Sequence, residues 1–437
     1  MFNTLRNAWK IPDLRKKLLF TLLIVVAFRF GSVVPVPFLN ASALGELMRS
    51  VNESGTALGY INMLTGGAFS YATLFALGIT PYINSSIIMQ LLSVAIPALE
   101  RMAKDGEEGR KKIAAITRYV TVGLGLVQGT AYYFYLKNSG ITVYSHGASA
   151  VFTAIVIILT FTAGTALIMW MGEQINQYGV GNGISIILFA GIVSRLPATG
   201  SQLWTYFKAA IDDPSNYGKY FVFAPLFIVL FLAVVWVIIF MNDAERRIPI
   251  QYAKKVVGRK MYGGQASHLP IKVTMSGVMP IIFASAILSI PSTIQLFVKN
   301  PGRFASAFFH AFSSTGWLYS VLYFLFIIVF AYFYMSIQYN PIEIANNLRT
   351  SNGTIPGIRP GRPTADFISK ILAKVTLIGA LFLAVVAIIP IIYGNIAGMP
   401  NMSMGGTSVI IMVGVALETT KQIESQMMMR HYKGFLD

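Results

Sequence analysis

The feature that most constrains this chain is a series of long apolar segments that recur along almost its whole length. Each is close to the 20 or so residues that an α-helix needs to cross a bilayer. Charged residues make up only 12% of the 437 positions, whereas soluble domains carry about 25%. The sequence therefore excludes a water-soluble globule and predicts an all-α membrane protein with ten transmembrane helices. The expected spans are 18–37, 74–97, 113–136, 150–172, 183–199, 220–241, 273–296, 317–339, 374–393 and 404–423.

The basic residues between these segments alternate with the predicted direction of crossing. Of the 34 Lys and Arg residues, 26 lie before the first span, in every second loop or in the tail, and seven lie in the other loops. Because Lys and Arg collect in cytoplasmic loops, this asymmetry predicts that both termini are cytoplasmic. Arg29 directly follows the apolar run of the first span, which favours a retained helix over a cleaved signal peptide.

Part of the second span recurs in the seventh. Residues 78–88 (GITPYINSSII) and 277–287 (GVMPIIFASAI) share Gly, Pro, Ile, Ser and Ile at a constant offset. The two spans are five apart and cross in opposite directions, which is typical of inverted repeats, although chance agreement among common membrane residues is the alternative. The proline of each copy is expected to bend or loosen its helix near mid-membrane, and such paired discontinuities are typical of a functional centre. We therefore expect a cytoplasmic segment 1–17, halves of five spans at 18–200 and 201–423, and a cytoplasmic tail 424–437.

A short Gly-rich segment at about 58–73 is too short to cross the membrane. It is expected to be a re-entrant half-helix, which is tolerated at membrane depth only where protein or a cavity surrounds it.

The spans contain few groups that could perform chemistry or couple to ions. The chain has no Cys and only four His, and we find no chain of ionisable residues for a proton relay and no phosphate-binding loop of an ATPase. The centre around the repeated prolines instead offers Ile79, Ile83, Met279 and Ile282. A constriction of aliphatic side chains closes by dewetting and suits a passive conduit. Ordinary packing or lipid contact is the alternative for each residue.

The segments 242–272 and 340–373 are long, basic and rich in turn formers. Residues 355–363 (IPGIRPGRP) form a rigid tip that would present Arg359 in a fixed position. These segments either only set the topology or form a docking surface for a large soluble partner such as a ribosome or a motor.

Taken together, these motifs resemble the SecY family, the channel subunits of bacterial Sec translocons. The resemblance covers about residues 15–432. The matching stretches are 75–83, 109–112, 172–175, 181–187, 267–273, 340–341, 347–348, 356–361 and 405–408.

The resemblance implies a protein-conducting channel, without enzymatic activity, cofactor or metal. Such a channel passes unfolded secretory polypeptides across the membrane and releases transmembrane segments through a lateral gate between spans two and seven. A ring of aliphatic residues seals the pore, and a plug closes its outer vestibule. The ring positions are Ile79, Ile83, Ile184, Leu188, Ile282 and Ile411, and the plug positions include Leu58, Tyr60, Ile61, Met63, Leu64, Gly66 and Gly67.

The resemblance also implies a polar cluster at the lateral gate, carried here by Asn84, Gln128 and Thr274. The expected partners are the SecE and SecG subunits, the SecA motor ATPase, the ribosome, the secretory preprotein with its signal peptide, and the lipid bilayer of a bacterial plasma membrane. The residues expected to dock the motor or the ribosome are Arg246, Arg247, Lys254, Lys255, Arg259, Arg359, Arg362, Arg430 and Tyr432.

Two other functions remain as alternatives. A secondary transporter of a small solute, built on inverted repeats, would need a polar pocket and a coupling ionisable group. An intramembrane enzyme would need a nucleophile and base, or a metal site, but the four His residues fall in loops or in the tail.

Overall fold

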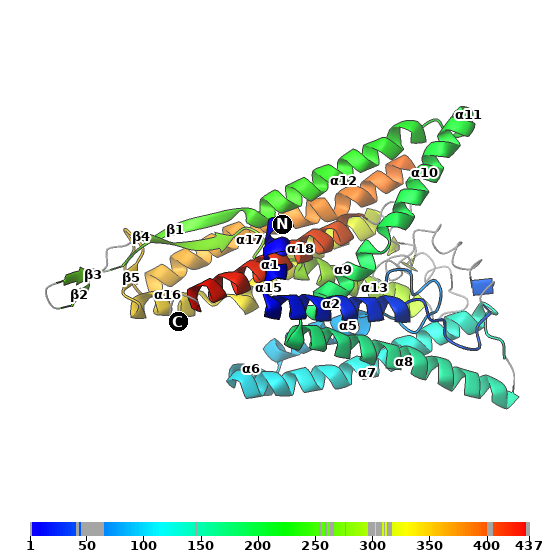
Figure 1. Ribbon diagram of the computed structural model, residues 1–437, viewed down its shortest axis with the longest axis horizontal. Coiled ribbons are helices and arrows are strands. Elements are labelled where there is room, and N and C mark those ends of the chain that lie inside the picture. Colours follow the sequence, from blue (N-terminus) through cyan, green and yellow to red (C-terminus); the bar gives the residue numbers. More distant parts are fainter. Residues whose placement is uncertain are drawn as a thin grey trace.

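The computed structural model is mostly helical, and its helices run roughly along one long axis (Figure 1). It describes residues 2–40, 43–44, 65–144, 147–252, 255–257, 260–262, 266–275, 277–295, 302, 308–309, 311–312, 317–399 and 405–433. The helices are α1 (Phe2–Lys10), α2 (Pro12–Gly31), α5 (Thr80–Ala95), α6 (Pro97–Lys104), α7 (Gly106–Asn138), α8 (Gly147–Tyr178), α9 (Gly183–Val193), α10 (Leu196–Asp212), α11 (Pro214–Tyr217), α12 (Tyr220–Asp243), α13 (Met279–Gln295), α15 (Trp317–Gln338), α16 (Pro341–Thr350), α17 (Arg362–Ala397) and α18 (Gly405–Lys433).

Each expected span overlaps at least one of these helices, and the fifth overlaps α9 and the start of α10. By length and composition, five helical segments in the described part of the chain could cross a membrane unaided. The pair α5 and α6 would add a sixth, although the two helices meet at an angle of 102°. The structure therefore shows several apolar spans, and the count of ten stays a prediction.

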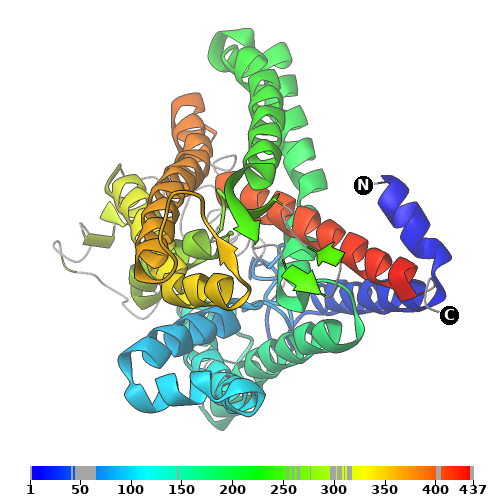
Figure 2. The same cartoon turned by 90° about the vertical axis from the view of Figure 1, so that its left-hand side faces the viewer.

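The packing of the first five spans is repeated by the last five. Among the described residues, α2, α5, α7, α8 and α9 form six packed pairs, and each has a counterpart among α12, α13, α15, α17 and α18. For example, α5 packs on α7 as α13 packs on α15, and α8 packs on α9 as α17 packs on α18. In the view of Figure 2, α6, α7 and α8 lie at the bottom and α12 and α17 at the top. This correspondence supports the inverted repeat, and the two groups meet where α5 packs on α13 and α9 on α18.

The repeated motif begins a helix in each copy and does not bend one. Gly78 and Gly277 have φ angles of +57° and +58°, and α5 and α13 start two residues later. A residue in the left-handed region cannot continue a right-handed helix, and the proline that follows suits a first turn, where its missing N–H is not needed. The predicted discontinuities at matching places are therefore confirmed, but each is the start of a helix and not a bend within one, and the predicted helical starts at 74 and 273 are wrong.

One end of the molecule carries a small sheet that the sequence analysis did not predict (Figure 1). Strand β1 (Glu245–Tyr252) pairs antiparallel with β4 (Ala266–Lys272), and β5 (Gly353–Thr354) pairs with the end of β1. Strands β2 (Lys255–Val257) and β3 (Lys260–Tyr262) form a separate ladder at the tip. The apolar side chains of Ile248 and Ile250 alternate with exposed ones, and they pack with Leu348, Ile355 and residues of α17. The segments 242–272 and 340–373 are thus joined in one folded unit.

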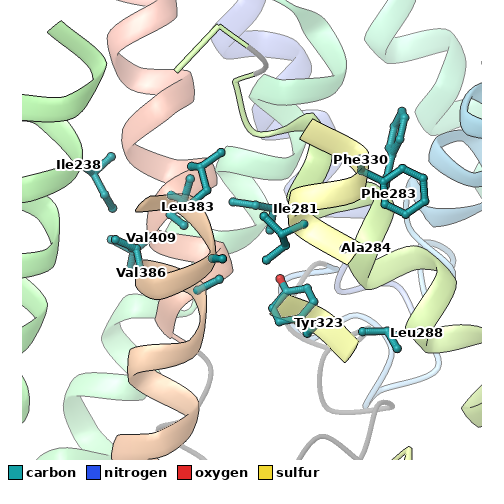
Figure 3. Close-up of a cluster of buried hydrophobic side chains, with 14 of the residues drawn as sticks. Ile238, Ile281, Phe283, Ala284, Leu288, Tyr323, Phe330, Leu383, Val386 and Val409 are labelled. Carbon is teal, nitrogen blue, oxygen red and sulfur yellow. The ribbon is translucent and has the colours of Figure 1, made fainter. Parts of the chain in front are cut away.

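The second half has its own apolar core. Side chains from α12, α13, α15, α17 and α18 meet there (Figure 3). The buried hydroxyl groups of Tyr323 and Thr407 lie 2.7 Å apart and satisfy one another. This core holds α13 against the rest of its half while leaving one face of α13 for α5.

A close helix contact in the first half gives the first prediction. A Cβ on Gly164 would overlap the backbone oxygen of Leu74, whereas a Cβ on the helical Gly123 would meet no atom within 4 Å. We expect Gly164→Ala to lower the free energy of unfolding by about 1–3 kcal/mol, because backbone must move to admit the methyl group. Gly123→Ala serves as the control and is expected to be neutral or slightly stabilising. Thermal unfolding of the purified protein in detergent measures both, and equal midpoints would contradict the proposed contact.

Candidate functional site

All six residues of the predicted ring belong to a single apolar cluster at the junction of the two halves. Ile79 and Ile83 come from the start of α5, Ile184 and Leu188 from α9, Ile282 from α13 and Ile411 from α18. Four of them are buried, and Ile83 and Ile184 are partly buried against the same cluster. Two pairs of ring residues are four positions apart, so each pair lies on one face of its helix.

The chemistry of this cluster is purely apolar. None of the six side chains has a hydrogen-bonding group, so the cluster can exclude water but cannot select a substrate by specific bonds. Such a constriction separates two aqueous spaces when closed, and can adapt to any chain that passes between its members.

Local contacts position α9 within this site. The side chain of Asn182 caps the helix by accepting hydrogen bonds from the backbone N–H groups of Ile184 and Ser185, at 3.1 and 3.3 Å. Gly183 approaches the backbone oxygen of Gly172 on α8 so closely that a Cβ would overlap it. The ring residues of α9 are therefore set on a helix end that is both capped and tightly packed.

Residues 65–78 precede α5, and we call them the plug stem. They are held in turns and not in the predicted half-helix; Gly66 and Gly67 adopt φ angles of +67° and +94°, which a helix does not allow. The hydroxyl of the buried Tyr132 donates to the Phe69 carbonyl at 2.6 Å, and the two rings stack. The other plug positions, Leu58, Tyr60, Ile61, Met63 and Leu64, lie outside the described residues.

The contact between α5 and α13 is mostly apolar but contains unpartnered polar atoms. Ile87 is buried in the core of the second half, and Ile83 and Leu91 pack against it. Thr80 and Asn84 lie on the same side of α5 as Ile87 and Leu91, because helical residues three, four or seven apart share a face. The Thr80 hydroxyl and the Asn84 side-chain oxygen are buried without a hydrogen-bond partner, so this interface is not as stable as its apolar contacts alone would make it.

The structure gives Thr274 a partner other than Asn84 or Gln128. Its hydroxyl lies 2.8 Å from the side-chain oxygen of Asn242 on α12. Both residues line a cavity of about 290 Å³ behind the start of α13. The three predicted cluster residues are thus not hydrogen-bonded to one another here, and the polar cluster stays a prediction.

The predicted docking residues divide between the folded end and α18. Arg246 and Arg247 lie on β1, where Arg247 pairs with Glu245 at 2.6 Å. Arg359 is exposed in the turn before α17, and Arg362 is the first residue of that helix. The turn is braced by Thr364, whose hydroxyl donates to the Arg359 carbonyl at 2.8 Å. Lys255 lies on β2 and Arg430 and Tyr432 on α18, while Lys254 and Arg259 lie outside the described residues.

Two ion pairs that join neighbouring helices were not predicted from the sequence. Arg118 on α7 pairs with Glu173 on α8 at 2.7 Å, and Lys421 on α18 pairs with Asp243 on α12 at 2.7 Å. Glu173 stands in the motif at 172–175, but its partner is 55 residues away in the chain, so no local spacing could reveal the pair. Among the described residues, no three His, Cys, Asp or Glu side chains come close enough to hold a metal ion.

Comparison with known proteins agrees with this geometry. Residues 73–420 match the SecY family. The chain is 41% identical over 444 residues to the protein translocase subunit SecY of Streptomyces coelicolor, covering all of both chains. It is 41% identical over 440 residues to the same subunit of Thermotoga maritima, covering 100% of this chain and 98% of the relative.

Two solved structures share the fold at low sequence identity. One, described as the structure of a protein conducting channel, is 18% identical with a TM-score of 0.65, covering 94% of this chain and 92% of the other. The other is Sec61 in the canine ribosome–channel complex from the endoplasmic reticulum, which is 17% identical with a TM-score of 0.62 and the same coverage.

Substitutions at two adjacent residues of α5 test our interpretation of the α5–α13 contact. Ser85 is buried and donates to the Thr117 carbonyl on α7 at 3.0 Å, whereas the Asn84 side-chain oxygen has no partner. We expect Asn84→Leu to stabilise this closed arrangement by about 1–2 kcal/mol, since it removes an unpaired buried group. Ser85→Ala should destabilise the protein by about 0.5–1 kcal/mol. Thermal unfolding in detergent distinguishes the two, and a loss of stability in both variants would contradict this assignment.

Proposed function

The chain belongs to the SecY family, and from this we propose that it is the central channel subunit of a Sec translocon, passing unfolded polypeptides across a bacterial plasma membrane. The observation that supports this function best is the apolar cluster in which both halves contribute the six ring residues. A ring built from two bodies can widen when the bodies separate, and its aliphatic side chains can fit closely around any sequence. We propose that the channel has no catalytic activity of its own and takes its energy from a partner.

The contact between α5 and α13 is proposed to be the lateral gate. These two helices join the halves on one side of the ring, and their interface carries the unpartnered polar atoms of Thr80 and Asn84. Burying such groups without partners costs free energy, which is regained if opening exposes them to water or to a polar segment. The gate would therefore be closed but easily opened, as release of transmembrane segments requires.

The plug stem is proposed to anchor the plug that closes the outer vestibule. Its attachment to α7 through Tyr132 and Phe69 fixes the stem to the first half. The plug could then move without losing its place beside the ring.

The folded unit of β1, β4, β5 and the turn before α17 is proposed to dock the SecA motor or the ribosome. Because β5 pairs with β1, force applied to either loop would reach both. The helix α17 continues from this unit for 36 residues into the second half, which offers a mechanical path to the gate. The SecE and SecG subunits are the further partners that membership of the family suggests.

Disulfide crosslinking tests the path of the polypeptide, because the chain contains no native Cys. We expect Ile282→Cys to crosslink to a cysteine-bearing secretory chain arrested midway through the membrane. Ile378→Cys is the control, because Ile378 lies on α17 and 57% of its surface is exposed. This variant should not crosslink to the secretory chain. Equal crosslinking at both positions, or none at either despite arrest, would exclude the proposed ring and favour reconsidering a solute transporter.

Charge reversal tests the docking site. We expect Arg359→Glu to reduce motor-driven export in reconstituted vesicles by about tenfold or more, since a central charge pair lost from an interface costs about 2–5 kcal/mol. Lys370→Glu makes the same charge change at an exposed position on α17 outside the predicted docking residues, and should have little effect. Normal export by the Arg359 variant, with both proteins inserted equally, would remove this residue from the docking site.

A further inference from the structure

Two arginines of the first half have no role in the function proposed above. Arg29 lies near the end of α2, and Arg195 lies between α9 and α10. Both are half-buried within segments expected to span the membrane. Arginine is costly at membrane depth, and where it occurs there it commonly marks a functional site with a specific partner.

The fold brings the Arg29 side chain and the end of α9, which precedes Arg195, to the plug stem. Arg29 Nη1 lies 3.4 Å from the backbone oxygen of Gly66. A Cβ on Gly66 would lie 2.8 Å from Arg29 Nη1 and 2.9 Å from the hydroxyl oxygen of Ser194, the residue before Arg195. The plug stem is therefore approached at Gly66 both by the Arg29 guanidinium group and by the end of α9, which leads directly into Arg195.

The described residues provide no carboxylate that would neutralise the charge of either arginine. Among the described residues, neither guanidinium group forms an ion pair with Asp or Glu. Arg195 Nη1 is buried and has no hydrogen-bond partner. A guanidinium group presents several donors in a planar fork that matches a carboxylate or a phosphate, so the unpartnered donor of Arg195 suits an anion of that shape.

The position of the site relative to the ring indicates which anion would reach it. Arg195 follows Leu188 by seven residues, which is about 10 Å along a helix. In the predicted topology α9 runs outward from the cytoplasm, so Arg195 lies on the outer side of the ring. A polypeptide that leaves the ring would meet this region next, and a carboxylate that found no partner among the aliphatic side chains would find one there.

We propose that Arg29 and Arg195 form an anion site on the outer side of the ring, which binds the Asp and Glu side chains of the passing polypeptide. Charge-assisted bonds between guanidinium and carboxylate are stronger than neutral hydrogen bonds, particularly where water is partly excluded. Each acidic residue that has crossed the ring would be held briefly, so backward movement through the apolar ring would be slower. This inference rests on the proposed function.

The test compares two secretory precursors that differ only in a short block, made of Asp in one and of Asn in the other. Each is driven partway into vesicles that contain the complete translocon, without a membrane potential, and the rate of backward sliding is measured after the motor is stopped. We expect the Asp block to slide back about threefold more slowly than the Asn block in the natural channel, in the range of a single partly exposed ion pair.

Arg195→Gln should abolish this difference without changing the Asn precursor, and Arg195→Lys should restore part of it. Lys208→Gln is the matched control, because Lys208 is an exposed basic residue on the neighbouring α10, and it should keep the full difference. Arg29→Gln and Arg29→Lys form a second pair of variants. Because Lys keeps the positive charge and Gln does not, the pair separates the effect of the charge from that of the contact with Gly66.

The outcomes separate the possible failures. If the Asn precursor does not cross the natural channel, the proposed function itself fails. If both precursors cross and Arg195→Gln affects them equally or not at all, only the anion site is overturned. Repeating the measurement at two contents of anionic phospholipid identifies the source of the anion. If the effect of Arg195→Gln on the sliding rate depends on the content of anionic phospholipid and not on whether the block is Asp or Asn, the site binds a lipid phosphate. That result would overturn binding of the polypeptide.

Discussion

The structure depends on a constraint that the bilayer imposes on the backbone: its N–H and C=O groups must be paired within the protein, because hydrocarbon offers no partners. Continuous helices meet this requirement, and most of the described chain is helical. Among the described residues, exceptions are the plug stem and residues 273–275 and 277–278, where the backbone is not helical just before α5 and α13. Both interruptions lie beside the junction of the two halves, where neighbouring helices can enclose them. The places at which the helical rule is broken are thus the places at which the channel is proposed to open.

The junction of the halves combines two kinds of contact with different consequences. Around the proposed ring, aliphatic side chains from four helices pack together, so they would seal by excluding water and would adapt to any occupant. Between α5 and α13, apolar packing is interrupted by the unpartnered polar atoms of Thr80 and Asn84. A channel with two exits requires a strong but unspecific seal. It also requires a neighbouring interface whose closed and open states differ little in free energy.

Beyond the ring, the distribution of charge gives the path a direction. The folded cytoplasmic unit is basic and exposed, which suits a surface that receives a large partner. The two arginines near the plug stem are half-buried and form no ion pair within the described chain, which suits transient contact with small anionic groups. By our proposals, the same residue type would therefore serve docking on one side and retention on the other, because burial changes how strongly a charge interacts.

The sequence by itself determined that the chain is a helical membrane protein of the SecY family, and it predicted the orientation and the ring residues, because hydropathy, charge asymmetry and family motifs are all local or additive properties of the chain. It also located the repeat, but it misjudged what the repeat does: only the backbone conformations of Gly78 and Gly277 show that the prolines start helices instead of bending them. The tertiary structure alone decided the pairing of β5 with β1, the bond between Thr274 and Asn242, and the meeting of Arg29 with the end of α9. These contacts join residues distant in the chain, and their existence depends on how the helices pack and not on any pattern within a segment.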